Sequence, residues 1–269
     1  MSGLSALGAL SPLGPLSALG EPDELADLLA HRRWVRRTLP FPHVVATDVF
    51  TDEVYAALEA DFVRLLDGGA ISQPSGSGYE ATWARLAEHA DGPLSLFLSR
   101  GWHDLLAGVA RVGTTTGDVS VGLHHHEPGG APGWPHNDLN PGWFPEDAPG
   151  PGEVGVDGLV DYHHGPADGS PARETVRAVS ALFYLANPPW AEGDGGETGL
   201  YDSVAAGART EGVLVPPVNN SLVLFECTPY SWHAYARASR HQRNSLVMWL
   251  HRPRQDVVER WGESSVVHW

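Results

Sequence analysis

The sequence contains no lysine, so all 17 of its basic residues are arginine. Any site that holds a carboxylate by charge therefore has to use arginine. The chain also contains 33 acidic residues, so its formal net charge is −16. This charge repels polyanions, so we expect neither nucleic acid nor an anionic membrane as a partner.

Cysteine and long apolar runs are also scarce. The single cysteine, Cys227, excludes an internal disulfide and is typical of a reducing cytoplasm, where we expect the protein to be located. Cys227 ends an apolar run, which favours a buried small residue over a nucleophile. No run approaches the ~20 apolar residues that a membrane span needs. Residues 1–20 lack basic residues and are interrupted by Gly and Pro, which indicates a low-complexity leader and not a signal peptide.

Hydrophobic periodicity divides the rest of the chain into a helical and a β-rich part, which we expect to form one compact domain. Residues 21–115 are predicted to be a helical support region, with helices over 22–37, from Thr51 to the glycines at 68–69, and over about 94–109, and a short strand at 41–46. From residue 116 to 254 the period is that of strands, with runs at 119–123, 179–186, 212–215, 221–225 and 244–250. The predicted fold is a β sandwich or barrel, followed by a tail or helix over 255–269.

Residues 139–177 interrupt this pattern. They are rich in Gly, Pro and Asp and have no clear periodicity. A loop of this length in a compact domain is usually a lid, a binding loop or disordered. We interpret the segment as a lid over a substrate, with a mobile surface loop as the alternative.

The stretch GWPHNDLNPGW places His136 and Asp138 one residue apart. A second His-x-Asp pair, His89 and Asp91, lies in a helical pattern, where residues two apart point to different sides and cannot share a metal. On a strand, residues two apart project from the same face, so the first pair can converge. By itself the pair leaves a metal site and a surface loop equally open.

A third ligand candidate, His233, follows the strand-like run NNSLVLF. Two histidines and one carboxylate leave open positions on a metal, which suits non-haem Fe(II) that must also bind a cosubstrate and oxygen. Ten residues further on, Arg243 and Ser245 share a strand face and are suited to clamping a carboxylate. Each residue alone is as simply explained by core packing or surface charge, so the ordered set carries the interpretation.

This ordered set resembles the iron(II)- and 2-oxoglutarate-dependent oxygenases, and most of all their prolyl-hydroxylase-like branch. The run ALFYLANPPWAEGDGGETGLY resembles the strand, loop and Gly-Gly pair of that branch. HEPGGAPGWPHND resembles its glycine-containing approach to the His-x-Asp motif, and PFPHVVATDVFTDEVYAAL its first strand and helix. The resemblance covers roughly residues 40–252.

The resemblance implies a double-stranded β-helix, or jelly roll, that requires Fe(II), 2-oxoglutarate and O2. The implied iron ligands, which form the catalytic centre, are His136, Asp138 and His233. Arg243 would bind the distal carboxylate of 2-oxoglutarate, assisted by Ser245 and Tyr184. Halogenating relatives lack the carboxylate ligand, so the presence of Asp138 favours hydroxylation of an unactivated C–H bond, with release of succinate and CO2.

One departure from the family is the run His124-His125-His126, where relatives often have an aromatic residue. On a strand the outer two side chains face away from the middle one, which disfavours a second metal site. His126 is instead a candidate contact to 2-oxoglutarate or substrate. Further candidate substrate contacts are Trp134, Asn137 and Arg173. We expect a small, amino-acid-derived substrate, and the sequence leaves the oligomeric state open.

Two other function classes remain open at this point. A cupin-like, non-catalytic metal-binding jelly roll is disfavoured, because a simple binder needs no carboxylate clamp. A zinc hydrolase that uses the same three ligands would need a general base beside the metal. Glu197 and Glu226 are the candidates for that base, and neither has a recognisable hydrolase setting.

Overall fold

A computed structural model of the chain describes residues 22–31, 33–75, 79–157, 164–166, 169–209 and 211–268. The predicted leader, residues 1–20, lies outside the described residues. Among these ranges, no helix combines the length and the apolar character that crossing a membrane requires.

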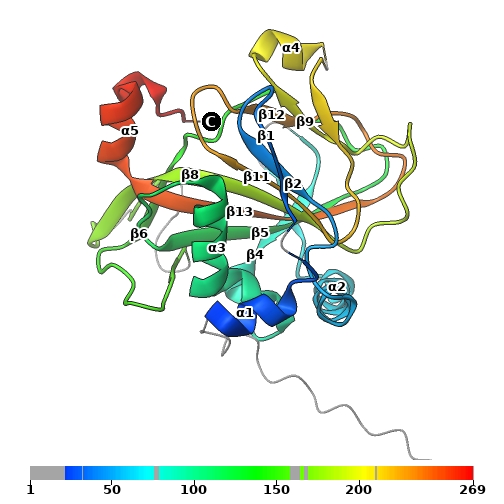
Figure 1. Ribbon diagram of the computed structural model, residues 1–269, viewed down its shortest axis with the longest axis horizontal. Coiled ribbons are helices and arrows are strands. Elements are labelled where there is room, and N and C mark those ends of the chain that lie inside the picture. The colour runs from blue at the N-terminus through cyan, green and yellow to red at the C-terminus, as the bar shows by residue number, and fades with distance from the viewer. Residues whose placement is uncertain are drawn as a thin grey trace, which may run out of the picture.

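A ten-stranded, mostly antiparallel sheet forms the centre of the molecule (Figure 1). Its main path is β1-β2-β11-β8-β13-β5-β4-β3, with β6 added beside β8 and β7 beside β5, so the sheet is open. The strands are β1 (Val35–Arg37), β2 (His43–Ala46), β3 (Gln73–Pro74), β4 (Thr82–Arg85), β5 (Asp118–His126), β6 (Pro141–Pro145), β7 (Gly155–Val156), β8 (Ala172–Tyr184), β11 (Ser221–Glu226) and β13 (Arg243–Pro253). A second sheet has the order β10 (Val213–Val215), β9 (Thr198–Tyr201), β12 (Trp232–Tyr235).

Helices of the N-terminal region gather on one side of the large sheet, and the small sheet lies on the other (Figure 1). These helices are α1 (Pro22–Leu28), α2 (Asp52–Asp67) and α3 (Arg100–Ala110), with 3-10 turns η2 (Leu86–His89) and η3 (Pro93–Leu98). As predicted, the Thr51 side chain caps α2 by accepting the N–H of Val54. Two short helices, α4 (Val204–Ala208) and α5 (Arg254–Trp261), and the turn η4 (Glu263–Ser265) follow later in the chain.

Strand alternation gives the large sheet two different faces. On β13, Leu246 and Met248 belong to the apolar core beneath the helices. The intervening Ser245, Val247 and Trp249 line a cavity on the opposite face. Because side chains of a strand alternate between faces, each central strand contributes to the core and to the cavity at once. The predicted mainly β fold is confirmed.

Two expectations about chain organisation were wrong in part. The helix expected over 22–37 ends at Leu28, because residue 29 bridges to Phe50 and Val35–Arg37 pairs with β2. Residues 139–177 are not one loop, since β6 pairs with the first residues of β8. In both places a neighbouring strand supplies backbone hydrogen bonds that the local pattern does not reveal. The expectation for Cys227 is confirmed: it is buried, and burial raises the pKa of its thiol well above the usual range.

Candidate metal and cosubstrate site

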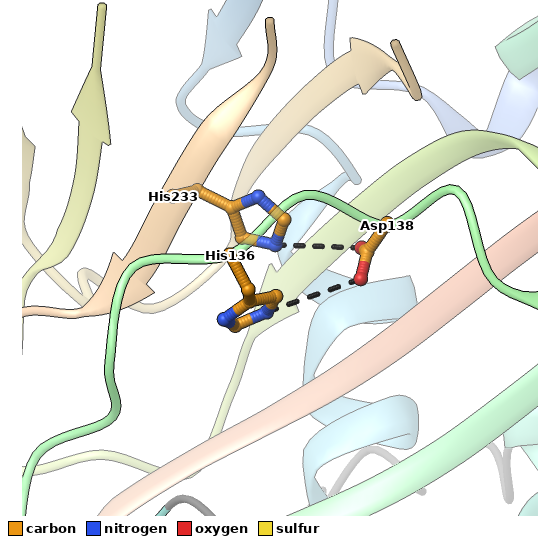
Figure 2. Close-up of side chains that lie close together, drawn as sticks. All are labelled: His136, Asp138 and His233. Carbon is orange, nitrogen blue, oxygen red and sulfur yellow. Dashed lines mark ion pairs between the residues drawn. The ribbon is translucent and has the colours of Figure 1, made fainter. Parts of the chain in front are cut away.

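His136 and His233 belong to distant segments that meet in an antiparallel bridge. The N–H of each residue donates to the carbonyl of the other, at 3.0 Å and 2.9 Å. This bridge sets the two imidazole rings side by side, with 4.4 Å between their centroids. Asp138 lies two residues after His136 and faces both rings (Figure 2). Its carboxylate oxygens are 3.9 Å from Nε2 of His136 and 3.4 Å from Nε2 of His233.

Backbone carbonyls also determine which ring nitrogen of each histidine is available to bind a metal. Nδ1 of His136 lies 2.8 Å from the carbonyl of Trp134, and Nδ1 of His233 lies 3.0 Å from the carbonyl of Ser231. A carbonyl only accepts, so each Nδ1 carries a proton and Nε2 is the ring nitrogen that remains to bind a metal. Burial, followed by the neighbouring His233, lowers the pKa of His136 to about 4. His136 is therefore neutral near pH 7, which is the ligating form.

Asp138 is buried and is held from two sides. Arg177 on β8 donates from Nη1 to Oδ1 at 3.2 Å, and Trp249 on β13 donates from Nε1 to Oδ2 at 2.8 Å. The guanidinium lies 3.8 Å from the centroid of the Trp249 ring. Burial alone would raise the pKa of Asp138, but His233 and Arg177 hold it well below its usual range. The carboxylate is therefore ionised and fixed in orientation, as a metal ligand requires.

Together the three residues fit a divalent metal with open positions. One ligand atom from each of His136, Asp138 and His233 lies within 4.8 Å of the others. No other group of His, Cys, Asp or Glu in the described part of the chain comes together in this way. Two neutral imidazoles and one carboxylate form the donor set that suits non-haem Fe(II).

A second cluster surrounds Arg243, which is buried at the start of β13. Its Nε donates to the carbonyl of Gly196 at 2.8 Å, and its Nη1 to Oγ of Ser245 at 3.4 Å. Nη2 lies 3.1 Å from Oγ1 of Thr198 and 3.5 Å from the hydroxyl of Tyr184. The three residues that the sequence assigned to a carboxylate clamp are thus brought together. Thr198 was missed, although it follows directly in the Gly-Gly-Glu-Thr segment that drew attention to this region.

The histidines of β5 border the same cluster. His126 pairs with Arg243 in the strand register, and His124 pairs with Ser245. The Tyr79 ring stacks on both imidazoles, with centroids 5.4 Å from His126 and 6.2 Å from His124. Burial, reinforced by the charge of Arg243, lowers the pKa of His124 to about 4 and that of His126 to about 2. The two imidazoles are therefore neutral, and Arg243 supplies the positive charge at this end.

One cavity of about 290 Å³ connects the two clusters. It is lined by the three metal-site residues, by Arg243, Ser245, Thr198 and His126, and further along by Ser120, Ser180, Asp157 and Arg85. Two residues of the predicted lid segment line this cavity, Asp157 from its middle and Arg177 from its end.

The remaining predicted substrate contacts lie elsewhere. Trp134 is 43% exposed and packs edge-on against the outer side of His136. Asn137 points away from the metal group and accepts the backbone N–H of Leu139. Arg173 pairs with the Asp118 carboxylate through both Nη atoms at 2.9 Å. None of these three is among the residues that line the cavity.

The structure also bears on the hydrolase alternative. Glu226 pairs with Arg252 and Arg260, and Glu197 lies 3.9 Å from Arg237. Neither glutamate lines the cavity. The general base that a zinc hydrolase would need is therefore not supplied by either candidate.

Comparisons with known proteins agree with this geometry. Residues 155–251, which include His233, Tyr184 and the Arg243-x-Ser245 pair, match the model of the 2OG-Fe(II) oxygenase superfamily. No curated protein sequence matches the chain. A prolyl-4-hydroxylase from Pseudomonas putida superposes with a TM-score of 0.50 at 19% identity, covering 88% of this chain and 100% of that one. A prolyl hydroxylase from Trichoplax adhaerens, in complex with a hypoxia inducible factor peptide fragment, gives a TM-score of 0.52 at 16% identity, covering 78% of this chain and 83% of that one.

At these identities the two structures establish a shared fold, which confirms the expected jelly-roll architecture. The family match assigns the cofactors Fe(II), 2-oxoglutarate and O2, for which the His-Asp-His group is the candidate metal site. The match to this superfamily over residues 155–251, the fold shared with the prolyl hydroxylases and the His-Asp-His group together indicate a 2-oxoglutarate-dependent non-haem iron oxygenase.

Proposed function

We propose that the protein hydroxylates an unactivated C–H bond of a small, amino-acid-derived molecule, with Fe(II) held by His136, Asp138 and His233. The observation that carries this proposal is that three candidate metal ligands and an arginine clamp for a carboxylate line one buried cavity. A metal-binding protein without catalysis would have no use for the clamp.

Each residue has a distinct task in this proposal. The Arg243 guanidinium binds the distal carboxylate of 2-oxoglutarate, with Ser245 and Tyr184 as hydroxyl partners. Apolar Leu182 and Val247, which line the cavity between the clamp and the metal group, exclude water. Bound iron supplies the oxidising chemistry, in which one atom of O2 converts 2-oxoglutarate to succinate and CO2 and the other is inserted into the C–H bond. Asp138 occupies the position that a halide would need, which favours hydroxylation.

The preference for a small substrate has two supports. The cavity has a volume of about 290 Å³, which suits a side chain or a small metabolite. The net charge of −16 disfavours an acidic carrier protein. The Trichoplax adhaerens structure holds a peptide fragment, so a peptide that inserts a single side chain is the competing substrate class.

The test is anaerobic absorption of the purified protein with Fe(II), before and after addition of 2-oxoglutarate. We expect a visible charge-transfer band when 2-oxoglutarate is added. The band should be lost in Asp138→Ala and Arg243→Ala and retained in Arg173→Ala, the control outside the cavity. Stoichiometric iron without the band would contradict 2-oxoglutarate chelation at this site and favour a metal binder or hydrolase. Substrate screening by succinate release follows a positive result.

A further inference from the structure

A second polar group lies in the cavity, away from Arg243. Ser180, Trp249 and Ser120 sit side by side in register on β8, β13 and β5, and all three line the cavity. Trp249 is four residues from Ser245 along β13, which is about 13 Å at the rise of a strand. The end carbons of a five-carbon diacid are at most about 6 Å apart, given four C–C bonds of about 1.5 Å. A molecule clamped beside Ser245 therefore ends short of this row.

Asp157 lies at the far side of the row and is the one carboxylate, besides Asp138, among the described residues that line the cavity. It is only 4% exposed and accepts the Ser120 hydroxyl at 2.9 Å. Arg85 Nε lies 3.4 Å from the same carboxylate, but the Arg85 guanidinium also donates to Glu88 at 3.2 Å. Two carboxylates thus share one guanidinium, so Arg85 compensates the charge of Asp157 only in part.

The hydroxyls add acceptor capacity beside that charge. Ser120 uses its proton on Asp157, so its oxygen is left with lone pairs only. The Ser180 hydroxyl has no hydrogen-bond partner among the described residues. Burying a hydroxyl without a hydrogen-bond partner costs free energy, which indicates that a ligand group supplies the missing hydrogen bond.

A buried carboxylate that is only partly compensated, beside a hydroxyl acceptor, fits a nitrogen cation. Burial, which outweighs the attraction of Arg85, raises the pKa of Asp157. A cation placed beside the carboxylate would replace the hydration lost on burial and favour the ionised form. We propose that Asp157 and Ser120 bind a protonated amine of the substrate, in a substrate subsite of the cavity that Ser180 borders. This assignment rests on the proposed oxygenase function and narrows its substrate class to amines.

The test measures binding apart from turnover. Calorimetry under anaerobic conditions, with Fe(II) and 2-oxoglutarate present, titrates the common amino acids and, for each one that binds, the counterpart without the amine, such as 4-methylpentanoate for leucine. We expect the wild-type protein to bind at least one amino acid and to bind its counterpart at least about tenfold more weakly, as the loss of a charge-assisted hydrogen bond implies. Failure of every amino acid to bind, or equal binding of both members of a pair, would overturn the proposal.

Variants of the subsite residues test whether Asp157 causes the preference for the amine. Asp157→Asn keeps the size of the side chain and an acceptor for Ser120, so we expect it to fold and to lose the roughly tenfold preference for the amine. Ser180→Ala should weaken the preference less. The control is Asp147→Asn, an exposed acid of the same segment, which should bind as the wild type does. An unchanged preference in Asp157→Asn would also overturn the proposal.

These experiments also distinguish failure of the proposed oxygenase function from failure of the amine subsite. The charge-transfer band should persist in Asp157→Asn, because this residue does not contact the metal ligands or Arg243. If the wild-type protein lacks the band but still prefers the amine in the absence of iron, the oxygenase proposal fails and the amine subsite stands. If the band is present and the preference is absent, the subsite assignment fails alone.

Discussion

The two ends of the cavity differ in how completely their polar groups are satisfied. At the Arg243 end, the guanidinium has hydrogen bonds to Gly196, Thr198 and Ser245. At the Asp157 end, one guanidinium is divided between two carboxylates, and the Ser180 hydroxyl has no hydrogen-bond partner among the described residues. The first end presents a guanidinium and the second a buried carboxylate that Arg85 compensates only in part, so the two ends select different molecules.

The origin of the residues explains this difference. Arg243 and Ser245 come from β13, a central strand that pairs with β5 over residues 243–250 and with β8 over residues 245–253. Asp157 follows the two-residue strand β7, and Arg85 ends β4 near the edge of the sheet. A central strand holds a group rigidly, as a cosubstrate common to all turnovers requires. An edge strand and its adjoining turn accept sequence change more readily, as a substrate-specific group requires.

The largest expected effect comes from breaking the metal group that lies between the two ends. In Asp138→Ala we expect loss of stoichiometric Fe(II) binding and, in addition, a loss of about 3–5 kcal/mol of stability, because the buried ion pair with Arg177 is broken. In His136→Ala, which removes a neutral ligand, we expect the same loss of iron with a smaller loss of stability. Metal analysis after anaerobic loading and urea unfolding measure the two effects. Equal stability of both variants would contradict the role assigned to Arg177.

The next effect concerns the Arg243 end alone. Arg243→Met should weaken 2-oxoglutarate binding on the order of 100-fold, since a buried charged partner of a carboxylate is lost, and should leave Fe(II) binding intact. Arg243→Lys should fall between Met and the wild type, because an ammonium keeps the charge and loses the two-pronged geometry. Calorimetric titration of 2-oxoglutarate into the iron-loaded protein without oxygen checks both variants. An unchanged affinity in Arg243→Met would place the cosubstrate elsewhere.

More of the residues at the Arg243 end of the cavity than at the Asp157 end could be predicted from the sequence. The spacing of His136 and Asp138, and their order with His233 and Arg243, carry a signal, and the structure brings all four to one cavity, although His136 and Asp138 lie outside the named strands. The two groups that hold Asp138 were not identified. Trp249 was within reach, because it shares the face of Ser245 four residues later on one strand.

Other residues gave no local signal. Arg177 and Asp157 lie in the segment that was interpreted as a lid, and their places depend on the pairing of β6 with β8 and of β7 with β5. Pairing between strands far apart in the sequence is set by the whole sheet and not by neighbouring residues. For the same reason the first helix is shorter than predicted, because its expected last turn, residues 35–37, pairs with β2 instead.

A smaller effect appears in the pH dependence of stability at the Arg243 end. Burial and the charge of Arg243 lower the pKa of His124 to about 4, whereas an unfolded histidine titrates near 6.5. Below pH 6.5 the unfolded chain binds a proton that the folded chain refuses, so stability is lost as the pH falls from about 6.5 towards 4. Between pH 7 and pH 5 this loss is about 2 kcal/mol. In His124→Phe, which retains a ring beside Tyr79, the decline measured by urea unfolding should be shallower by that amount. Parallel curves for the two proteins would show that the imidazole is not held neutral.

The smallest effect compares one serine from each end. Ser245 accepts a hydrogen bond from Arg243 at 3.4 Å, so Ser245→Ala should lower stability by about 1 kcal/mol. Ser180 is equally buried, but its hydroxyl makes no hydrogen bond with the described residues, so Ser180→Ala should leave the stability of the ligand-free protein unchanged or raise it by about 1 kcal/mol. The two substitutions remove the same atom from equivalent faces of adjacent strands, β13 and β8, so packing losses nearly cancel in the comparison. Urea unfolding of both variants measures these changes in stability. A repeat with an amino acid that binds the wild-type protein shows which of the two serines contacts the ligand. If Ser180 completes its hydrogen bonds with a bound amine, the added amino acid should stabilise Ser180→Ala less than the wild type and stabilise Ser245→Ala as much.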